Sequence, residues 1–475
     1  MRRSIKLLGL AGLLGAVLFS TRALAQDAAE VDEGDVGKKA SVKAAPPPVT
    51  PSVAKPKIGD VSTSGYLRGG FGASNQKGRM TCFQLAIPGS LVSKYRLGNE
   101  CEVWGEFQFT TVVYADDDDD AVARLHFMPT VYIPTTYLGY SPTGAINSPA
   151  QFTTSTGAVL SFPNLYVDMK GISWLGGGSA WIGTRYYKRE SVYISDFFYW
   201  NPSGVGGGIE DIHLGKDLRL SYAIFAVDGE PGSPSDASSP PLPLQVDFGV
   251  RHDLQLRGVH PWESGEFQVG FQVIMDMSNN TATHSGWGAT VQYVQKVLGG
   301  ENKAAFQYGR GGGTGFGTLA RFYYPDFSVR HELSESRRRF VDVLTVQPTE
   351  WFGTQAVFVY QHDDLGTQGG VTNWYSTGGR ASVALSKHFK VLGEAGYDYV
   401  QKSNGSDPQW LAKFTIAPAI AAGKQAMHRP ELRVFGTWAT WNASARGATI
   451  DSGRLYTNTN LLSGITFGMQ AETLW

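Results

Sequence analysis

Residues Ser64–Glu106 read SGYLRGGFGASNQKGRMTCFQLAIPGSLVSKYRLGNECEVWGE, and this stretch decides the fold class. At its start, Tyr66 and Arg68 alternate with apolar or small residues, and at its end Trp104 and Glu106 do the same. Side chains that alternate with a period of two lie on opposite faces of a β-strand. The stretch is therefore predicted to form two strands, each with one charged and aromatic face and one apolar face.

The only cysteines of the chain, Cys82 and Cys101, lie between these two strands. In an exported protein such a pair is expected to form a disulfide, here across an external hairpin loop; two free thiols are the alternative. A soluble sandwich keeps its charges on the wet outer face, whereas a membrane barrel faces lipid outside and water inside. The pattern favours a transmembrane β-barrel.

Several stretches also carry a resemblance to a known family: GYLRGG, TCFQ and SKYRLGNECEVWGE, then Thr184–Asp211, and finally ITFGMQAETLW at the C-terminus. In this order they are similar to the maltoporin and sucrose-porin family, the sugar-specific porins of the bacterial outer membrane. The resemblance extends over most of Asp60–Trp475. It implies an all-β, transmembrane antiparallel barrel of 18 strands, a constriction loop folded into the lumen, and a homotrimer. Length alone would also fit 16 strands.

The chain is predicted to have three parts. Residues 1–25 have a basic start, a short apolar core and an Ala-x-Ala end, which indicates a signal peptide. Residues 26–59 are rich in Pro and Ala and are expected to form a periplasmic tether. Residues 60–475 would form the barrel. The signal peptide holds four basic residues and no acidic one, so its removal changes the formal charge from -1 to -5, which argues against nucleic acid as a partner.

Charged residues identify the lumen face of the strands. A residue such as Arg68 would cost about 2–4 kcal/mol on the lipid face near the midplane, so Arg68, Glu106 and Arg380 are expected to face the lumen. Aromatic residues an even number of positions away share that face. The rings placed in the lumen by this argument are Tyr66, Trp104 and Trp374. The resemblance implies that they belong to an aromatic track for sugars; a place in the interfacial aromatic belt is the alternative.

Thr184–Trp200 is dense in aromatic and basic residues. The resemblance implies that a loop here forms the constriction, where Tyr193 replaces a frequent His and Phe198 replaces a constricting Tyr. For Arg189, a solvated loop charge is the alternative. The polar constriction residues implied by the resemblance are Arg68, Arg96, Glu106, Arg189 and Asp196, and the aromatic ones are Tyr193 and Phe198.

These residue types suit a sugar channel. Aromatic rings fit the flat C–H face of a pyranose, and charged groups bond its hydroxyls. Leu474 and Ala289 stand where the family has aromatic residues, so the resemblance implies a shorter track that favours smaller or different sugars over maltodextrins. The sequence thus predicts a sugar-selective porin with sugars and outer-membrane lipid as partners. No catalytic motif, metal-spaced histidine pair or cofactor motif is evident, so no enzyme is expected. A general diffusion porin, a barrel enzyme and a surface receptor remain alternatives.

Overall fold

The computed structural model describes residues 55–85, 94–116, 118–134, 144–148, 151–154, 159–228, 248–278, 283–315, 329, 331–446 and 460–475. The expected signal peptide and most of the expected tether lie outside the described residues. The barrel belongs to the unit formed by residues 55–475.

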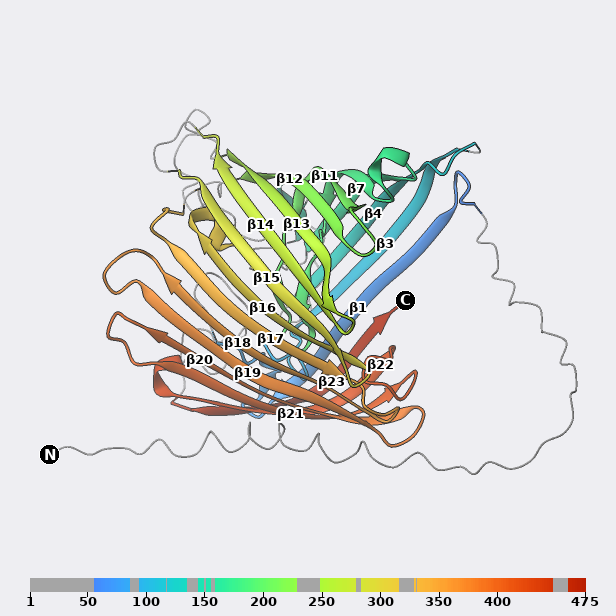
Figure 1. Ribbon diagram of the computed structural model, residues 1–475. Helices are drawn as coiled ribbons and strands as arrows, with labels where there is room; N and C mark the ends of the chain where they lie inside the picture. The colour runs from blue at the N-terminus through green and yellow to red at the C-terminus, as the bar shows by residue number, and fades with distance from the viewer. Residues whose placement is uncertain are drawn as a thin grey trace, which may run out of the picture. The chain divides into compact units, whose positions relative to one another are not determined.

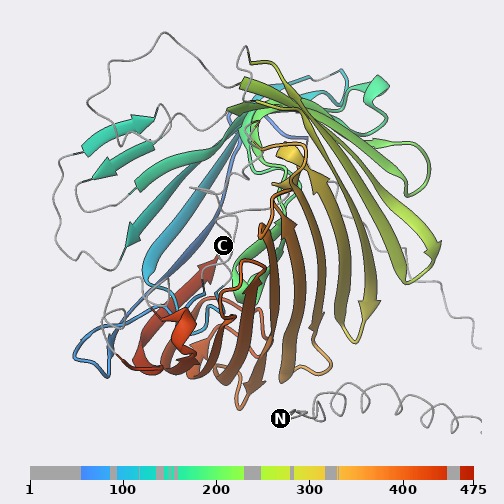
Figure 2. The same cartoon turned by 90° about the vertical axis from the view of Figure 1, so that its left-hand side faces the viewer.

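Eighteen long antiparallel strands form a closed barrel, in which β23 pairs with β1 (Figures 1 and 2). The family's strand number is thus confirmed, and 16 strands are excluded. The barrel strands are β1 (Val61–Ser74), β3 (Glu102–Ala115), β4 (Val122–Pro134), β7 (Val159–Lys170), β8 (Ser179–Arg185), β11 (Gly204–His213), β12 (Arg219–Asp228), β13 (Phe248–Trp262), β14 (Gly265–Asp276), β15 (Gly286–Val297), β16 (Gly300–Arg310), β17 (Ser336–Val346), β18 (Phe352–Asp364), β19 (Val371–Ala384), β20 (Phe389–Lys402), β21 (Gln409–Ala421), β22 (Glu431–Trp441) and β23 (Ser463–Leu474).

Shorter elements lie in the connections. No helix among the described residues is long and apolar enough to cross a membrane. The short strands are β2 (Gly78–Arg79), β5 (Gly144–Ser148), β6 (Gln151–Thr154), β9 (Glu190–Val192) and β10 (Phe197–Trp200), and the 3-10 turns are η1 (Ser173–Leu175), η2 (Tyr193–Ser195), η3 (Gly311–Thr314) and η4 (Ala443–Ala445).

The closing strand β23 shows the two faces of the barrel. Phe467 and Met469 are each 53% exposed on the outer face, whereas Gln470 and Glu472 are buried on the inner face. An apolar outer face suits lipid, and a polar inner face suits a wet lumen. The phase expected from the sequence is therefore confirmed.

The two ends of the barrel differ in the length of their connections. The connections at the end where β1 begins and β23 ends are short, and one of them is the acidic run Asp116–Asp120 between β3 and β4. The opposite end carries long connections. Short turns are typical of the periplasmic side of such barrels, and long loops of the external side.

Two of the long connections fold into the lumen rather than outward. Inner loop A is residues 75–85 and 94–101, and inner loop B is residues 186–203, whose β9–β10 hairpin lies inside the ring of strands (Figure 2). The expected Cys82–Cys101 disulfide is present in inner loop A, with a Cα–Cα distance of 5.9 Å. Its expected external position is wrong, because residues beside the disulfide such as Phe83 and Leu97 are buried against the inner wall.

Inner loop A is held to the wall by its backbone and by one ring. The N–H of Leu97 donates to Glu394 Oε1 at 2.9 Å, and its carbonyl accepts from Lys413 Nζ at 2.6 Å. The ring of Tyr95 lies directly on Gly378 and Gly396, where a Cβ atom would come within 2.4 and 2.0 Å of ring atoms. These glycines therefore make room for the loop.

Substituting Gly396 by Leu should loosen inner loop A, because the new side chain occupies the position of the Tyr95 ring. We expect a higher and noisier single-channel conductance in planar bilayers. The matched control is Gly393→Leu on the same strand, where a Cβ would meet nothing within 4 Å. Equal currents from the two variants would contradict the assignment of Tyr95 as an anchor.

Candidate functional site

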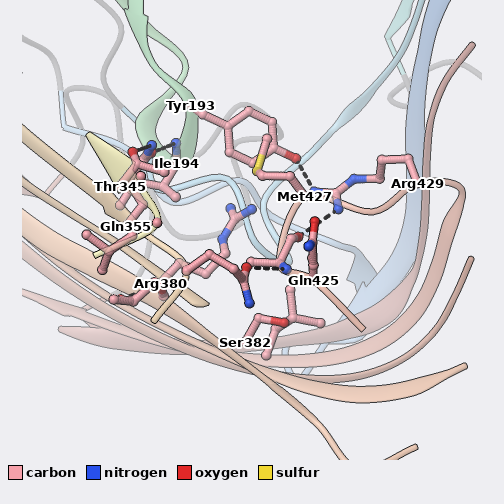
Figure 3. Close-up of a pocket in the computed structure, with 16 residues that line it drawn as sticks. Tyr193, Ile194, Thr345, Gln355, Arg380, Ser382, Gln425, Met427 and Arg429 are labelled. Carbon is pink, nitrogen blue, oxygen red and sulfur yellow. Dashed lines mark hydrogen bonds between the residues drawn. The ribbon is translucent and has the colours of Figure 1, made fainter. Parts of the chain in front are cut away.

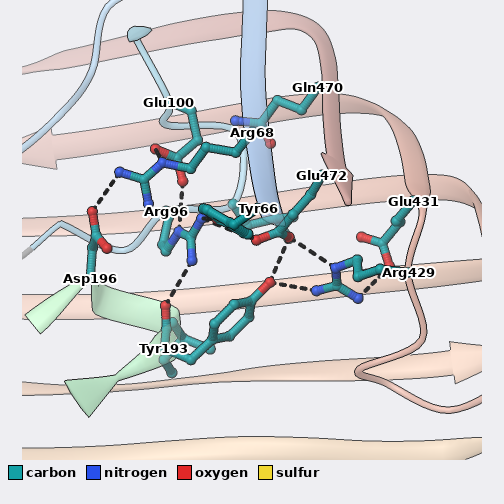
Figure 4. A network of polar contacts seen from close by, with 12 residues as sticks. Tyr66, Arg68, Arg96, Glu100, Tyr193, Asp196, Arg429, Glu431, Gln470 and Glu472 are labelled. Carbon is teal, nitrogen blue, oxygen red and sulfur yellow. Dashed lines mark hydrogen bonds and ion pairs between the residues drawn. The ribbon is translucent and has the colours of Figure 1, made fainter. Parts of the chain in front are cut away.

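The two inner loops meet in the lumen beside β1 and β23. The N–H of Lys94 donates to the carbonyl of Ser195 at 3.1 Å, and the N–H of Arg96 donates to the carbonyl of Ile194 at 3.0 Å. The backbones of the two inner loops therefore hold each other at this point. The charged side chains around this contact form the candidate site, which Figure 4 shows in part.

Glu472 is the centre of this site, with a side chain only 1% exposed. Its Oε1 accepts from Tyr66 Oη at 2.8 Å and from Arg96 Nη2 at 3.1 Å. Its Oε2 accepts from Tyr193 Oη at 2.5 Å, from Arg429 Nε at 3.1 Å and from Arg433 Nη2 at 3.0 Å. One carboxylate on β23 thus joins β1, both inner loops, β22 and the turn that precedes β22 (Figure 4).

A second cluster surrounds Arg68 on β1. Its Nη2 donates to Asp196 Oδ2 at 2.7 Å and to Glu102 Oε1 at 3.1 Å, and its Nε lies 3.5 Å from Glu100 Oε2. Burial alone would raise the pKa of the Asp196 carboxyl, but Arg68 and then Arg96 hold that pKa below its ordinary value. Asp196 therefore stays ionised and ties inner loop B to β1.

The two clusters form one network, because Arg96 also contacts Glu100 through Nε at 2.6 Å. Buried charges are tolerated only when they are paired, and removal of one partner typically costs about 3–5 kcal/mol. The network includes more cations than carboxylates among the described residues: Arg68, Lys94, Arg96, Lys390, Arg429 and Arg433 against Glu100, Glu102, Asp196, Glu431 and Glu472.

Two of the expected aromatic residues, Tyr66 and Tyr193, lie within this network. Both rings are half-buried, and both hydroxyls donate to Glu472. The guanidinium of Arg96 lies 4.7 Å from the centroid of the Tyr193 ring. Burial, followed by the nearby Glu472 charge, raises the pKa of Tyr193, so its hydroxyl keeps its proton. The rings are thus held in fixed positions between cations and one anion.

Trp104 and Trp374 face the lumen as expected, but their rings are covered. Trp104 is 3% exposed, and its Nε1 donates to Glu106 Oε1 at 3.1 Å. Trp374 is 1% exposed and packs edge-on against Phe197 of inner loop B, with ring centroids 5.3 Å apart. In this structure Trp374 supports inner loop B, and neither indole offers an open face to a passing sugar. A role for Trp104 and Trp374 in an aromatic track therefore stays a prediction.

Arg189 and Phe198 lie elsewhere on inner loop B, next to Tyr186. The Arg189 guanidinium lies 3.3 Å from the centroid of the Tyr186 ring and 4.8 Å from that of Phe198. All three side chains are half-buried. Arg189 therefore lies between two rings and is not a solvated loop charge, although the structure does not place it beside Glu472.

The sequence did not identify Glu472, Arg429, Arg433 or Glu100 as site residues. The period of β23 does place Glu472 on the lumen face, but its partners lie on other strands and loops. No alternating pattern indicates where Arg429 lies, because this residue is in a turn at the periplasmic end. Only the fold brings these charges to one point.

Replacing Glu472 by Gln should destabilise the barrel by about 3–5 kcal/mol, because three guanidiniums lose their shared carboxylate. The measurement is the thermal unfolding midpoint in detergent, read from the gel shift of the folded barrel. Glu350→Gln is the matched control, since this carboxylate is 84% exposed and lies 3.6 Å from Lys424 Nζ. A shift as small as that of the control would contradict the central role of Glu472.

Comparison with known families matches residues 61–475 to the family described as LamB porin. Similar solved structures include Acinetobacter baumannii OccAB2 (9% identity, TM-score 0.46) and OccAB1 (11% identity, TM-score 0.45). The matches cover 88% and 89% of this chain and 98% of each of those chains. The Salmonella typhi OmpF complex with daunomycin is 9% identical, with a TM-score of 0.44. This match covers 88% of this chain and 98% of the OmpF chain. Because the family match spans the entire barrel, this chain belongs to the LamB porin family and is an outer-membrane porin.

Proposed function

We propose that this porin is selective for sugars. The observation that carries the proposal is the pair of half-buried rings, Tyr66 and Tyr193, held at the meeting point of the two inner loops by Glu472, Arg96 and Arg429. A ring offers an apolar surface to the flat face of a pyranose, and the flanking charges can exchange hydrogen bonds with its hydroxyls.

The arrangement suits passage rather than tight binding. Each charge of the network already has a partner, so a sugar hydroxyl competes with an existing bond and gains little net free energy. A channel needs binding that is strong enough for entry and weak enough for release. A half-buried ring between paired charges meets both requirements.

Small sugars are the favoured substrates. Trp104 and Trp374 are covered, and the positions of Leu474 and Ala289 lack the expected rings. Few open ring faces remain for a long chain of sugar units to slide along. We therefore infer a preference for monosaccharides or disaccharides over maltodextrins.

The proposal predicts that small sugars block single-channel current in planar bilayers. Tyr193→Ala should weaken this binding by about 1–2 kcal/mol, the scale of a lost aromatic contact and its buried area. Tyr193→Phe should weaken it less, because the ring remains. Tyr375→Ala is the control, since Tyr375 is 40% exposed on the outer face. If no sugar blocks the wild-type current, the channel is a general diffusion porin and the proposal is wrong.

We also propose a homotrimer, which rests on the resemblance to sugar porins. Sedimentation of the purified protein in detergent should give the mass of three chains. A single species with the mass of one chain would overturn this proposal, without affecting the assignment of the barrel.

A further inference from the structure

A cavity of about 250 Å³ lies between inner loop B and the periplasmic end of the barrel (Figure 3). Tyr193 and Ile194 cover it on the side of the constriction. Its wall is formed by Gln355, Arg380 and Ser382 from β18 and β19. Its volume is slightly below the range of pockets that hold drug-sized ligands, so it suits a solute of about one sugar ring.

The turn between β21 and β22 borders the cavity on the periplasmic side. Gln425, Ala426, Met427 and Arg429 of this turn line it. The N–H of Ala426 donates to Gln347 Oε1 at 3.0 Å, and Arg429 Nη1 donates to the carbonyl of Ala426 at 3.0 Å. The turn therefore folds under the lumen in a fixed conformation, and Arg429 joins it to the hydroxyl of Tyr193 (Figure 3).

The charged groups in the lining of the cavity are positive. The lining includes two guanidinium groups, those of Arg380 and Arg429, and no carboxylate. Ser382 is 3% exposed, and its Oγ has no hydrogen-bond partner in the part of the chain that the structure describes. A buried polar atom without a partner costs free energy, and a bound ligand that bonds it would remove that cost.

The charged residues next to the cavity do not neutralise the positive charge of its lining. Arg380 Nη2 and Lys413 Nζ lie 2.6 and 3.0 Å from the same carboxylate, that of Glu394. Two cations thus share one anion beside the cavity, and the larger network around Glu472 also has one cation more than it has carboxylates among the described residues. The guanidinium of Arg380 lies 5.4 Å from the centroid of the Tyr193 ring, which also lines the cavity.

From this geometry we propose that the cavity is a second binding site for small sugar acids, such as a hexuronate. The carboxylate of the solute would bond Arg380, its hydroxyls would bond Ser382 Oγ and Gln355, and one face of its ring would lie against Met427. This inference rests on the sugar selectivity proposed above. It adds a preference for anionic sugars at the periplasmic side of the constriction.

The test uses the full-length porin in planar bilayers at constant ionic strength, with solute added on the side of the short turns. D-glucuronate and D-glucose are the probes, because they differ only at C6, and acetate tests a carboxylate without a ring. We expect glucuronate to bind about tenfold more tightly than glucose, the scale of one charge-assisted hydrogen bond, and acetate to leave the current unchanged.

Two variants locate the site. Arg380→Gln should abolish most of the preference for glucuronate, and Ser382→Val should weaken glucuronate binding about threefold, since one neutral hydrogen bond is lost. The second variant leaves the Arg380–Glu394 ion pair in place, so it remains informative if the first does not fold. Thr377→Val, on the outer face of the same strand, is the matched control.

The outcomes separate this inference from the general proposal. If neither glucose nor glucuronate blocks the current, the sugar selectivity itself is wrong. If both block it equally, or if Ser382→Val and Thr377→Val behave alike while glucose still blocks, the sugar selectivity stands and the anionic site is overturned. Block by acetate at the concentration of glucuronate would also overturn it, because any carboxylate would then suffice.

Discussion

The lumen of this barrel is organised by one buried carboxylate. Glu472 is excluded from water, so its charge must be met by donors from the protein. Tyr66 donates from β1, and Arg433 donates from β22. Arg96 donates from inner loop A, Tyr193 from inner loop B, and Arg429 from the turn before β22. The positions of both inner loops therefore depend on the same group, which also lies at the seam where β23 closes the barrel on β1.

The face of each strand that points into the lumen could be predicted from the sequence, because the membrane imposes it. Each strand separates lipid from water, so a single charge such as Arg68 identifies the inner face of the whole strand. That reasoning placed Tyr66, Trp104 and Trp374 on the lumen side, as the structure has them. The disulfide could likewise be predicted, because the chain has only two cysteines and they flank one connection.

Contacts inside the lumen could not be predicted from the period of the strands. Tyr66 and Glu472 are 406 residues apart, and nothing local in either strand indicates that they pair. Inner loop A was expected outside because, counted from a periplasmic N-terminus, the connection between the first two strands lies at the external end. The reason for its inward fold is spread over the wall: Gly378 and Gly396 leave room for Tyr95, and Glu394 and Lys413 meet the backbone of Leu97. Phe197 likewise covers Trp374, although the two residues lie far apart in the sequence.

The rigidity of the constriction follows from how its charges are paired. Arg96 and Arg429 each bond both a tyrosine hydroxyl and the Glu472 carboxylate, so movement of either ring breaks hydrogen bonds to a cation and to Glu472. A solute then meets rings and charges that are already in place, and little ordering entropy is lost when it binds. The same pairing keeps each new hydrogen bond weak in net terms, because an existing one must be exchanged for it. Fixed geometry with weak net binding allows a channel to distinguish solutes by the arrangement of their hydroxyls while still releasing them.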